Sequence, residues 1–425
     1  MDKNSIAKAV RLLDTKEDLL NLLNQIKQGE MAKCGMSDKF YPFTMKLLNY
    51  YCNPNNSFHR YKQFKIKKKS GGFKLITAPR NQSFMLLLRY VNEIFKAVYT
   101  PSNHAMGFTE ERSVVTNADM HKGHNYVFNI DLKDFFPSIH QARVWKRLQL
   151  KPLLFKQPIA NVVAGLCSMK EKLEDGSVRY VLPQGAPTSP IITNMICDNL
   201  DRRLAGLAKR FGVVYSRYAD DITFSSMHNV YHSSGEFIKE LRRIVESQGF
   251  IMNEDKTRLQ KLGTRQEVTG IIVSDKLNVS QKYVRDIRNI LYIWRKYGYA
   301  IAFNKFFPKY KETKGHVKKG NPDMVNVLDG KLMYLKMVKG EDDSVYMRLK
   351  TQFDKLCNSL HDNTRTTQHG ITYVETLPVL EFERKNNTAI TIVTTKPKEF
   401  FYIVHTLQEV TEDTQKSISE NFIPH

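Results

Sequence analysis

Three classes of protein are disfavoured by what the sequence lacks. No apolar run approaches the roughly 20 residues that a membrane-spanning helix needs, so we expect no membrane partner. The N-terminal residues show no basic segment followed by an apolar one, so we expect no secretory signal. The five cysteines are scattered, without Cys-x-x-Cys spacing, which favours reduced thiols in the cytoplasm over a disulfide frame or a zinc site.

Acidic residues are also scarce. The chain of 425 residues has 43 acidic against 65 basic side chains, a formal net charge of +22. This excess favours a polyanionic partner, and nucleic acid before an anionic membrane because no basic amphipathic anchor stands out. From residue 371 onward eight acidic residues outnumber five basic ones, so the positive charge lies upstream of this tail.

The spacing of apolar residues predicts both helices and strands. The length favours two to three folding units of about 150 residues each. Helices are expected over residues 5–29 with a break near Thr15, over 81–99, 191–204 and 235–249, after Ser280, and over 399–421. Strands are expected within 64–76, 126–131, 213–224, 267–279, 371–382 and 389–394.

Two lysine-rich stretches suggest contact with phosphates. Residues 64–76 predict a hairpin around Gly71-Gly72, which suits a cover that closes over a phosphate-bearing ligand; a solvated hairpin explains the pattern equally well. Residues 304–320 interleave lysines with Phe306, Phe307 and Tyr310. This favours stacking on unpaired bases, and a linker composition explains it about as well.

Two adjacent acids, Asp220 and Asp221, follow Tyr218-Ala219 at the tip of an expected hairpin. Two carboxylates at such a short distance raise each other's pKa. A cation bound between them would relieve the repulsion. A solvated turn is the alternative, because Asp is common in turns. A third acid, Asp131, ends an expected buried strand, where binding groups are often found. Three carboxylates of this kind suit a site for two Mg²⁺ ions that transfers phosphoryl groups.

The chain resembles the reverse transcriptases over roughly residues 60 to 340. Three motifs carry the resemblance, and they occur in the family's order. They are the strand ending in Asp131 with Phe135-Phe136 after it, then Leu182-Pro183-Gln184-Gly185, and then Tyr218-Ala219-Asp220-Asp221. The resemblance implies an α+β right-hand polymerase fold with fingers, an antiparallel-sheet palm and a helical thumb, plus a small C-terminal α/β extension. The expected parts are an N-terminal helical region (1–59), fingers (60–125), palm with fingers insertions (126–275), thumb and RNA-binding region (276–345) and C-terminal extension (346–425).

The resemblance also implies roles for single residues. Lys256 resembles the family lysine near the leaving group, a candidate general acid, and Phe136 the bulky residue that excludes a 2′-hydroxyl. The lysine-rich hairpin resembles the fingers segment that closes over the triphosphate. Lys74 stands where the family often has Arg, and a lysine offers a single point charge where the guanidinium of arginine can form two parallel hydrogen bonds. The expected ligands of two Mg²⁺ ions, with Mn²⁺ as a substitute, are Asp131, Leu132, Asp220 and Asp221. The expected nucleotide-binding residues are Lys68, Lys74, Asp134, Phe135, Phe136, Gln184 and Gly185.

Two short elements resemble those of bacterial retron enzymes, Asn117-Ala118-Asp119-Met120-His121 and Val268-Thr269-Gly270. The helix after Ser280 is basic, which suits a nucleic-acid backbone or, equally, a solvated face. An ordinary surface or core position remains an alternative for His121. The expected RNA-binding residues are Asn117, His121, Val268, Thr269, Gly270, Lys282, Arg285 and Arg288.

The retron resemblance implies an RNA-directed DNA polymerase with a structured non-coding RNA as template and primer. Extension from an internal 2′-hydroxyl would give a branched RNA–DNA product, in phage defence with an effector protein. The expected partners are this RNA, its cDNA, dNTPs and the effector. The alternatives are another defence-associated reverse transcriptase, a group II intron type, or a non-catalytic RNA-binding scaffold. The intact acids argue against the scaffold, because unpaired buried carboxylates are costly to a pure binder.

Overall fold

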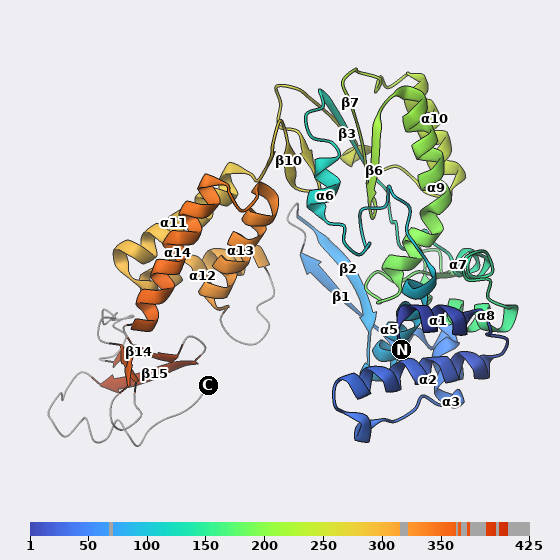
Figure 1. The fold of residues 1–425 in the computed structure, drawn as a ribbon, viewed down its shortest axis with the longest axis horizontal. Coiled ribbons are helices and arrows are strands. Elements are labelled where there is room, and N and C mark those ends of the chain that lie inside the picture. Colours follow the sequence, from blue (N-terminus) through green and yellow to red (C-terminus); the bar gives the residue numbers. More distant parts are fainter. Residues whose placement is uncertain are drawn as a thin grey trace. The chain divides into compact units, whose positions relative to one another are not determined.

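The computed structural model describes residues 1–67, 71–314 and 322–362, and four strands in the tail. The chain divides into two compact units, Met1–Asn278 and Val279–His425 (Figure 1). In the part of the chain that the structure describes, none of the helices combines the length and apolar character needed to cross a bilayer.

The first unit begins with helices that pack on α5. The expected break near Thr15 is confirmed: the Thr15 side chain accepts from Asp18 N–H and Asp18 accepts from Thr15 N–H, so a capping box starts α2 there. The helices of this unit are α1 (Lys3–Val10), α2 (Lys16–Lys33), α3 (Met45–Cys52), α4 (Ser57–Arg60), α5 (Gln82–Val98), α6 (Val114–Asp119), α7 (Gln141–Leu148), α8 (Gln157–Leu166), α9 (Ser189–Phe211) and α10 (Glu236–Ser247), with 3₁₀ turns at Ser37–Lys39, Pro54–Asn56 and Glu254–Lys256.

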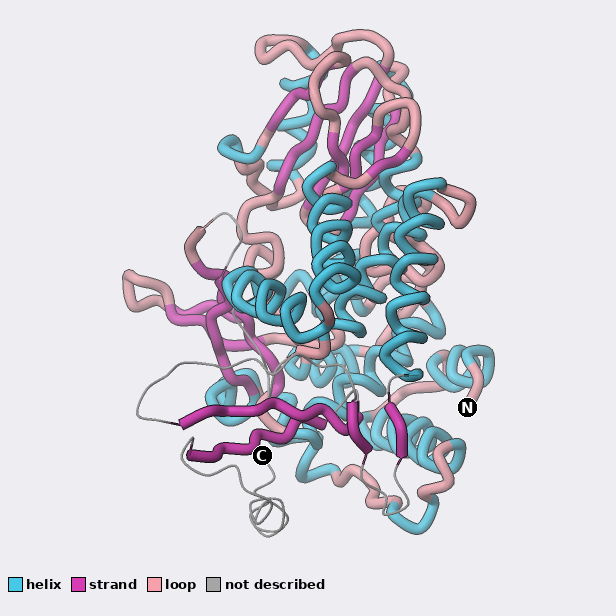
Figure 2. The backbone as a smooth tube through the Cα atoms, turned by 90° about the vertical axis from the view of Figure 1, so that its left-hand side faces the viewer, coloured by secondary structure: helices cyan, strands magenta, loops and turns pink. Residues whose placement is uncertain are grey.

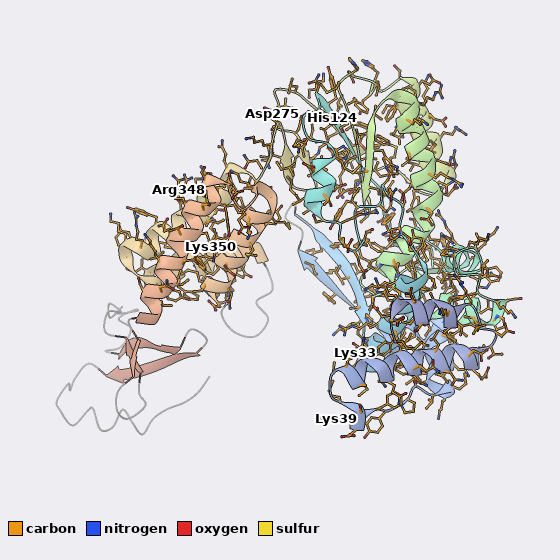
Figure 3. The ribbon with its side chains drawn as sticks, in the orientation of Figure 1. Lys33, Lys39, His124, Asp275, Arg348 and Lys350 are labelled. Atoms are coloured by element: carbon orange, nitrogen blue, oxygen red, sulfur yellow. The ribbon has the colours of Figure 1, made fainter. Side chains whose placement is uncertain are left out.

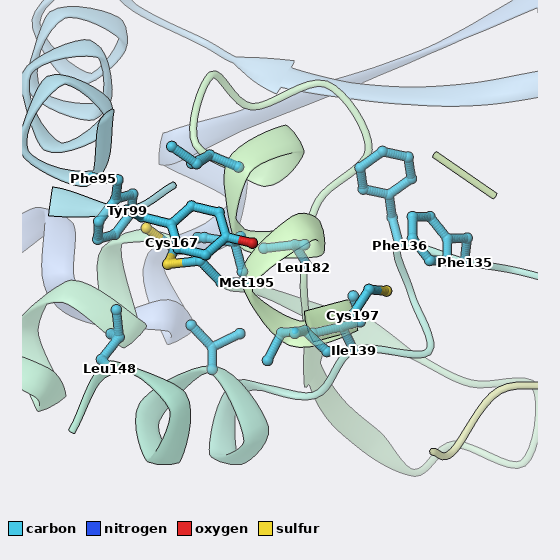
Figure 4. Close-up of a cluster of buried hydrophobic side chains, with 14 of the residues drawn as sticks. Phe95, Tyr99, Phe135, Phe136, Ile139, Leu148, Cys167, Leu182, Met195 and Cys197 are labelled. Carbon is cyan, nitrogen blue, oxygen red and sulfur yellow. The ribbon is translucent and has the colours of Figure 1, made fainter. Parts of the chain in front are cut away.

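One hydrophobic core joins these helices. Phe95 and Tyr99 of α5 and its C-cap, Leu148 of α7 and Met195 of α9 are all buried in it (Figure 4). Arg60 is fully buried beside this core, and its guanidinium donates to the carbonyl oxygens of Tyr51, Gly165 (3.0 Å) and Ser168. Carbonyl groups at the ends of α3 and α8 thereby have a shared donor.

The expected lysine-rich hairpin is confirmed. Strands β1 (Tyr61–Lys67) and β2 (Phe73–Pro79) pair antiparallel, with Tyr61 opposite Pro79 and Lys67 opposite Phe73. Gly71 and Gly72 both have a positive φ, as the turn requires. A second hairpin, which sequence reasoning did not predict, consists of β4 (Met169–Lys172) and β5 (Val178–Val181).

The first unit contains a four-stranded antiparallel sheet, which lies among the strands in the upper part of Figure 2. Its order is β6-β7-β3-β8, formed by β3 (Tyr126–Asp131), β6 (Val214–Tyr218), β7 (Asp221–Ser226) and β8 (Arg258–Lys261). One face packs aromatic side chains toward α10: Tyr215 stacks on Phe224, which contacts Phe237 edge-on. The strands predicted over 126–131 and 213–224 are therefore confirmed. So is the prediction that Asp131 ends its strand.

A small sheet, β11-β10-β9, completes the first unit. It consists of β9 (Glu267–Val268), β10 (Ile271–Val273) and β11 (Leu277–Asn278). The turn between β9 and β10 has a positive φ at both Thr269 and Gly270. The hairpin expected over 267–279 is thus a three-stranded sheet, and helix α6 contacts all of its strands.

The second unit begins with a helical part. It contains α11 (Gln281–Tyr297), α12 (Tyr299–Lys314), α13 (Met324–Lys339) and α14 (Ser344–Asp362), and Ser280 caps α11 as expected. Lys350 of α14 bonds Asp329 of α13 (3.4 Å) and Asp354 (2.8 Å) (Figure 3). Since α14 also packs on α11, the helical bundle continues past residue 345, where the thumb was expected to end.

Expectations for two stretches of the second unit need correction. The interpretation of residues 304–320 as a linker is wrong up to residue 314, because these residues continue helix α12. The expected stacking of Phe306 on an unpaired base is also wrong, because this side chain is buried. The helix expected over 399–421 is also wrong at its start. Residues Glu399–Thr406 form β15, which pairs with β14 (Thr388–Lys396), as suits a run of aromatic and β-branched residues.

Other expectations for the tail are tested only in part. Strand β14 confirms the strand expected at 389–394. Within 371–382, β13 (Thr372–Val374) pairs with β12 (Thr364–Thr366). Residues 375–382 and 407–421 lie outside the described residues.

Candidate active site

A tight turn between β6 and β7 presents Asp220 and Asp221. Tyr218 and Asp221 are Cα partners across the hairpin, and Ala219 has a φ of +59°. Gly107 lies so close to the turn that a Cβ there would come within 2.6 Å of the Ala219 nitrogen. The turn is therefore packed from outside and has little room to move.

Asp131 lies beside this turn because of the strand register. It is the last residue of β3 and the Cα partner of Asp221, and Leu132 N–H donates to the Asp220 carbonyl oxygen (3.1 Å). The structure therefore brings Asp131 beside two adjacent acids that come much later in the sequence. Leu132 is itself buried directly after Asp131.

The loop after α10 holds the carboxylate of Asp131. Lys256 Nζ donates to one oxygen (2.8 Å) and Asn253 Nδ2 to the other (3.2 Å), while Asn253 N–H donates to the Asp131 carbonyl oxygen (2.8 Å). Lys256 was expected near the site and lies there. Asn253 was missed, although it stands in the same short run as Lys256.

The electrostatics of the three acids are unfavourable. Partial desolvation, with repulsion from Asp220 and Asp131, raises the pKa of Asp221 to about 6, although its side chain keeps contact with solvent. Desolvation also raises the pKa of Asp220, and the charges of Lys74 and Lys256 offset this in part. Lys74 on β2 is thus close enough to act on the acidic turn.

The donor chemistry of the site fits a divalent cation. Carboxylate oxygens are the hard ligands that Mg²⁺ prefers. Desolvation and the neighbouring acids raise the pKa values of Asp220 and Asp221, and a bound cation would oppose this rise. Asp131, Asp220 and Asp221 would hold the ion. As placed, no three acidic, histidine or cysteine side chains of the described residues form a ready-made metal cage.

Several expected nucleotide-binding residues have defined contacts with neighbouring elements. Phe136 is buried, with its ring centroid 5.5 Å from Phe135 (Figure 4) and 6.4 Å from Phe108. The Gln184 carbonyl oxygen accepts from Thr77 N–H on β2 (2.8 Å), and a Cβ on Gly185 would lie 2.9 Å from the Thr77 oxygen.

The other two expected nucleotide-binding residues differ in what the structure shows of them. Asp134 is exposed, with a φ of +48°. Lys68 lies outside the described residues.

A buried ion pair behind the turn was missed by sequence reasoning. Arg217 and Asp201 are both fully buried, with Arg217 Nε and Nη2 each 2.7 Å from a carboxylate oxygen of Asp201. Arg217 Nη1 also donates to the Ala219 carbonyl oxygen in the turn (3.1 Å). The one signal in the sequence was a charged residue directly before Tyr218, in a strand whose other residues are uncharged.

The residues expected to bind RNA differ in burial. Asn117, His121 and Val268 are buried, and both ring nitrogens of His121 lie 2.7 Å from serine hydroxyls. The expectation that the His121 ring contacts RNA directly is therefore wrong, because the ring is fully buried and both of its nitrogens have a serine partner. Exposed positions are held by Gly270 and, on α11 of the second unit, by Lys282, Arg285 and Arg288. Thr269 is half-buried.

A sequence model of the reverse transcriptases (RNA-dependent DNA polymerases) matches residues 66–284, about half of the chain. The chain belongs to the reverse transcriptase family. The retron Mx65 reverse transcriptase of Myxococcus xanthus is 36% identical over 255 residues, covering 56% of this chain and 57% of that protein. The retron Ec86 reverse transcriptase of Escherichia coli is 31% identical, covering 58% of this chain and 72% of that protein.

These relatives confirm the resemblance to bacterial retron reverse transcriptases and the α+β polymerase fold. The chain spans about half the length of the Myxococcus xanthus relatives that it matches. Among solved structures, a telomerase from Candida albicans is similar with a TM-score of 0.37 and 11% identity, covering 79% of this chain and 68% of that one.

We expect Asp201→Asn to destabilise the first unit of this reverse transcriptase by about 3–5 kcal/mol, because it leaves the buried Arg217 charge uncompensated. Denaturant unfolding followed by the fluorescence of Trp145, in a Trp294→Phe background, measures this. Asp198→Asn on the same helix is the control, because Asp198 is half-exposed and pairs with Arg147. An equal effect of the two changes would contradict the special role of Asp201.

We expect the stability of the first unit to depend on pH through His121. Burial, with a smaller effect of His124, lowers the pKa of His121 to about 3, whereas an unfolded histidine titrates near 6.5. Between these values the unfolded chain binds more protons, so stability falls by about 1.4 kcal/mol per unit as pH drops below 6.5. His121→Gln should remove this slope between pH 4.5 and 6.5. The exposed control His232→Gln should leave it unchanged.

Proposed function

We propose that this protein is an RNA-directed DNA polymerase that copies a cognate structured RNA. The observation that carries the proposal is the β3–β7 register, which sets Asp131 opposite Asp221 and next to Asp220. Family membership supports it, since the reverse transcriptase model matches residues 66–284, which include all three acids.

The residues of the site divide the work. Asp131, Asp220 and Asp221 would hold two Mg²⁺ ions, with Mn²⁺ as a substitute. Bound there, the ions would activate a 3′-hydroxyl and stabilise the triphosphate charge. Lys74 would pair with the triphosphate. Lys256 would protonate the leaving group.

The nucleotide would lie between β2 and the turn that precedes α9. Gln184 is fixed to Thr77 by a main-chain hydrogen bond, so Gln184 and Gly185 would give the nucleotide a rigid surface to pack on. Asp134, Phe135 and Phe136 would line the sugar side, where Phe136 would exclude a 2′-hydroxyl.

We further propose a retron-type reaction. The net charge of +22 supports a nucleic-acid partner, and the exposed bases Lys282, Arg285 and Arg288 on α11 would contact phosphates of an RNA stem-loop. Synthesis would start from an internal 2′-hydroxyl and give a branched RNA–DNA product for phage defence with an effector. In this proposal residues 60–125 act as fingers, 126–275 as palm and 276–345 as thumb.

Replacing both turn acids, Asp220→Asn with Asp221→Asn, should lower dNTP incorporation by at least about 10²–10³-fold, because the charge that binds the cations is lost. Incorporation on a DNA-primed RNA template with Mg²⁺ measures this. Asp275→Asn is the control, because Asp275 is an exposed acid in the turn after β10. Equal activity of the double variant and the unaltered protein would refute the enzyme proposal.

Replacing Phe136 with Val should raise ribonucleotide incorporation relative to dNTP incorporation by about tenfold or more, because the smaller side chain leaves space for a 2′-hydroxyl. Single-nucleotide insertion with matched dNTP and rNTP measures the ratio. Phe211→Val, at the end of α9, controls for a general loss of packing. An unchanged ratio in the Phe136 variant would count against its role as the steric barrier.

A further inference from the structure

Helix α6 covers the face of the β6–β7 hairpin opposite the aromatic one, and there the contacts are polar. His121, just after α6, lies within 2.7 Å of Ser216 Oγ on β6 and of Ser225 Oγ on β7. All three side chains are fully buried. One imidazole therefore bridges both strands of the hairpin that ends in the acidic turn.

The hydrogen bonds of this cluster form a chain with one direction. Ser216 Oγ donates to Asn117 Oδ1 (2.7 Å), so its lone pair must accept from His121 Nε2–H. His121 Nδ1 then carries no proton and accepts from Ser225 Oγ–H. The low pKa of this buried ring, about 3, keeps it neutral. His121 is thus fixed as the Nε2–H tautomer.

The chain continues into the small sheet. Asn117 Nδ2 donates to Thr269 Oγ1 (3.4 Å), and Thr269 Oγ1 donates to the Val114 carbonyl oxygen (3.4 Å). Thr269 stands in the β9–β10 turn with a φ of +47°, where a β-branched residue is strained. Such a conformation persists only where surrounding contacts hold it.

A second polar connection runs between the same two sheets. Gln260 on β8 donates to the Glu267 carbonyl oxygen (3.0 Å) and accepts from Glu267 N–H (2.8 Å) on β9. Gln260 Nε2 also bonds Asn129 Oδ1 on β3. The β9–β11 sheet is therefore tied to the central sheet at two places.

We propose that Asn117, His121 and Thr269 are positioning residues, whose hydrogen-bond chain holds the acidic hairpin and couples it to the β9–β11 sheet without touching nucleic acid. The proposal rests on the proposed polymerase function for its kinetic consequence. Its structural part, the tautomer and the chain, stands independently.

Nitrogen NMR of the full chain labelled with ¹⁵N-histidine tests the structural part. The His121 signals, assigned by their loss in His121→Gln, should show a protonated Nε2 and an unprotonated Nδ1 that do not titrate between pH 5 and 8. An Nδ1–H tautomer, or titration near 6.5, would overturn the proposal. This outcome does not depend on polymerase activity, so it is separate from a failure of the proposed function.

Paired variants test the kinetic part. Thr269→Val removes the hydroxyl and keeps the shape, whereas Thr269→Ser keeps the hydroxyl. We expect Val to lower kcat for dNTP incorporation about tenfold, Ser to restore most of it, and both to bind an RNA hairpin annealed to a DNA primer within twofold of the unaltered protein.

His121→Gln should behave like Thr269→Val, and the exposed His232→Gln should have no effect. Thermal unfolding of each variant confirms that the protein is folded at the assay temperature. Loss of RNA affinity with unchanged kcat would show direct RNA contact instead, and equal kcat for the Val and Ser variants would show that the hydroxyl does not matter. Either result overturns the proposal.

Discussion

The buried Arg217–Asp201 pair is the interaction on which the acidic turn depends. A charge in the interior is tolerated only if it is paired and its other donors are satisfied, and Arg217 meets both conditions with Asp201 and the Ala219 carbonyl oxygen. The main chain of Arg217 also pairs with His104 and Met106. A movement of the turn would therefore separate Arg217 from Asp201 and leave both charges buried without a partner. This cost fixes the position of Asp220 and Asp221.

The two faces of the hairpin hold it by different physical means. The face toward α9 and α10 uses aromatic packing and the ion pair, whereas the face toward α6 uses small hydroxyls and one neutral imidazole. Hydrogen bonds in a buried chain lose their geometry quickly when the groups shift. Both faces therefore define the orientation of the hairpin, through the Arg217–Asp201 pair on one side and the His121 chain on the other, and the aromatic face adds apolar burial.

The sequence predicted what depends on local pattern and order. Strand ends, the Gly71-Gly72 hairpin and the three acids follow from periodicity, turn residues and a family motif. The partner of Arg217 could not be predicted, because Asp201 meets it only through the packing of α9 on β6. The burial of His121 could not be predicted either, since a short polar run looks alike on a surface and inside a fold. Residues 399–406 were misjudged because a short apolar run suits a helix or a strand.

The site combines one ion pair whose charges compensate each other with two carboxylates whose charges are not fully compensated. Arg217 and Asp201 neutralise each other, whereas desolvation and the neighbouring acids keep the pKa values of Asp220 and Asp221 raised. Lys74 and Lys256 offset this only in part for Asp220, as do Lys256 and Arg258 for Asp221. Such unfavourable groups persist where the surrounding fold stabilises them and where a ligand gains from them. The rigid support from both faces prevents the acids from relaxing apart. Their repulsion is therefore kept in the folded protein, and a bound cation would relieve it.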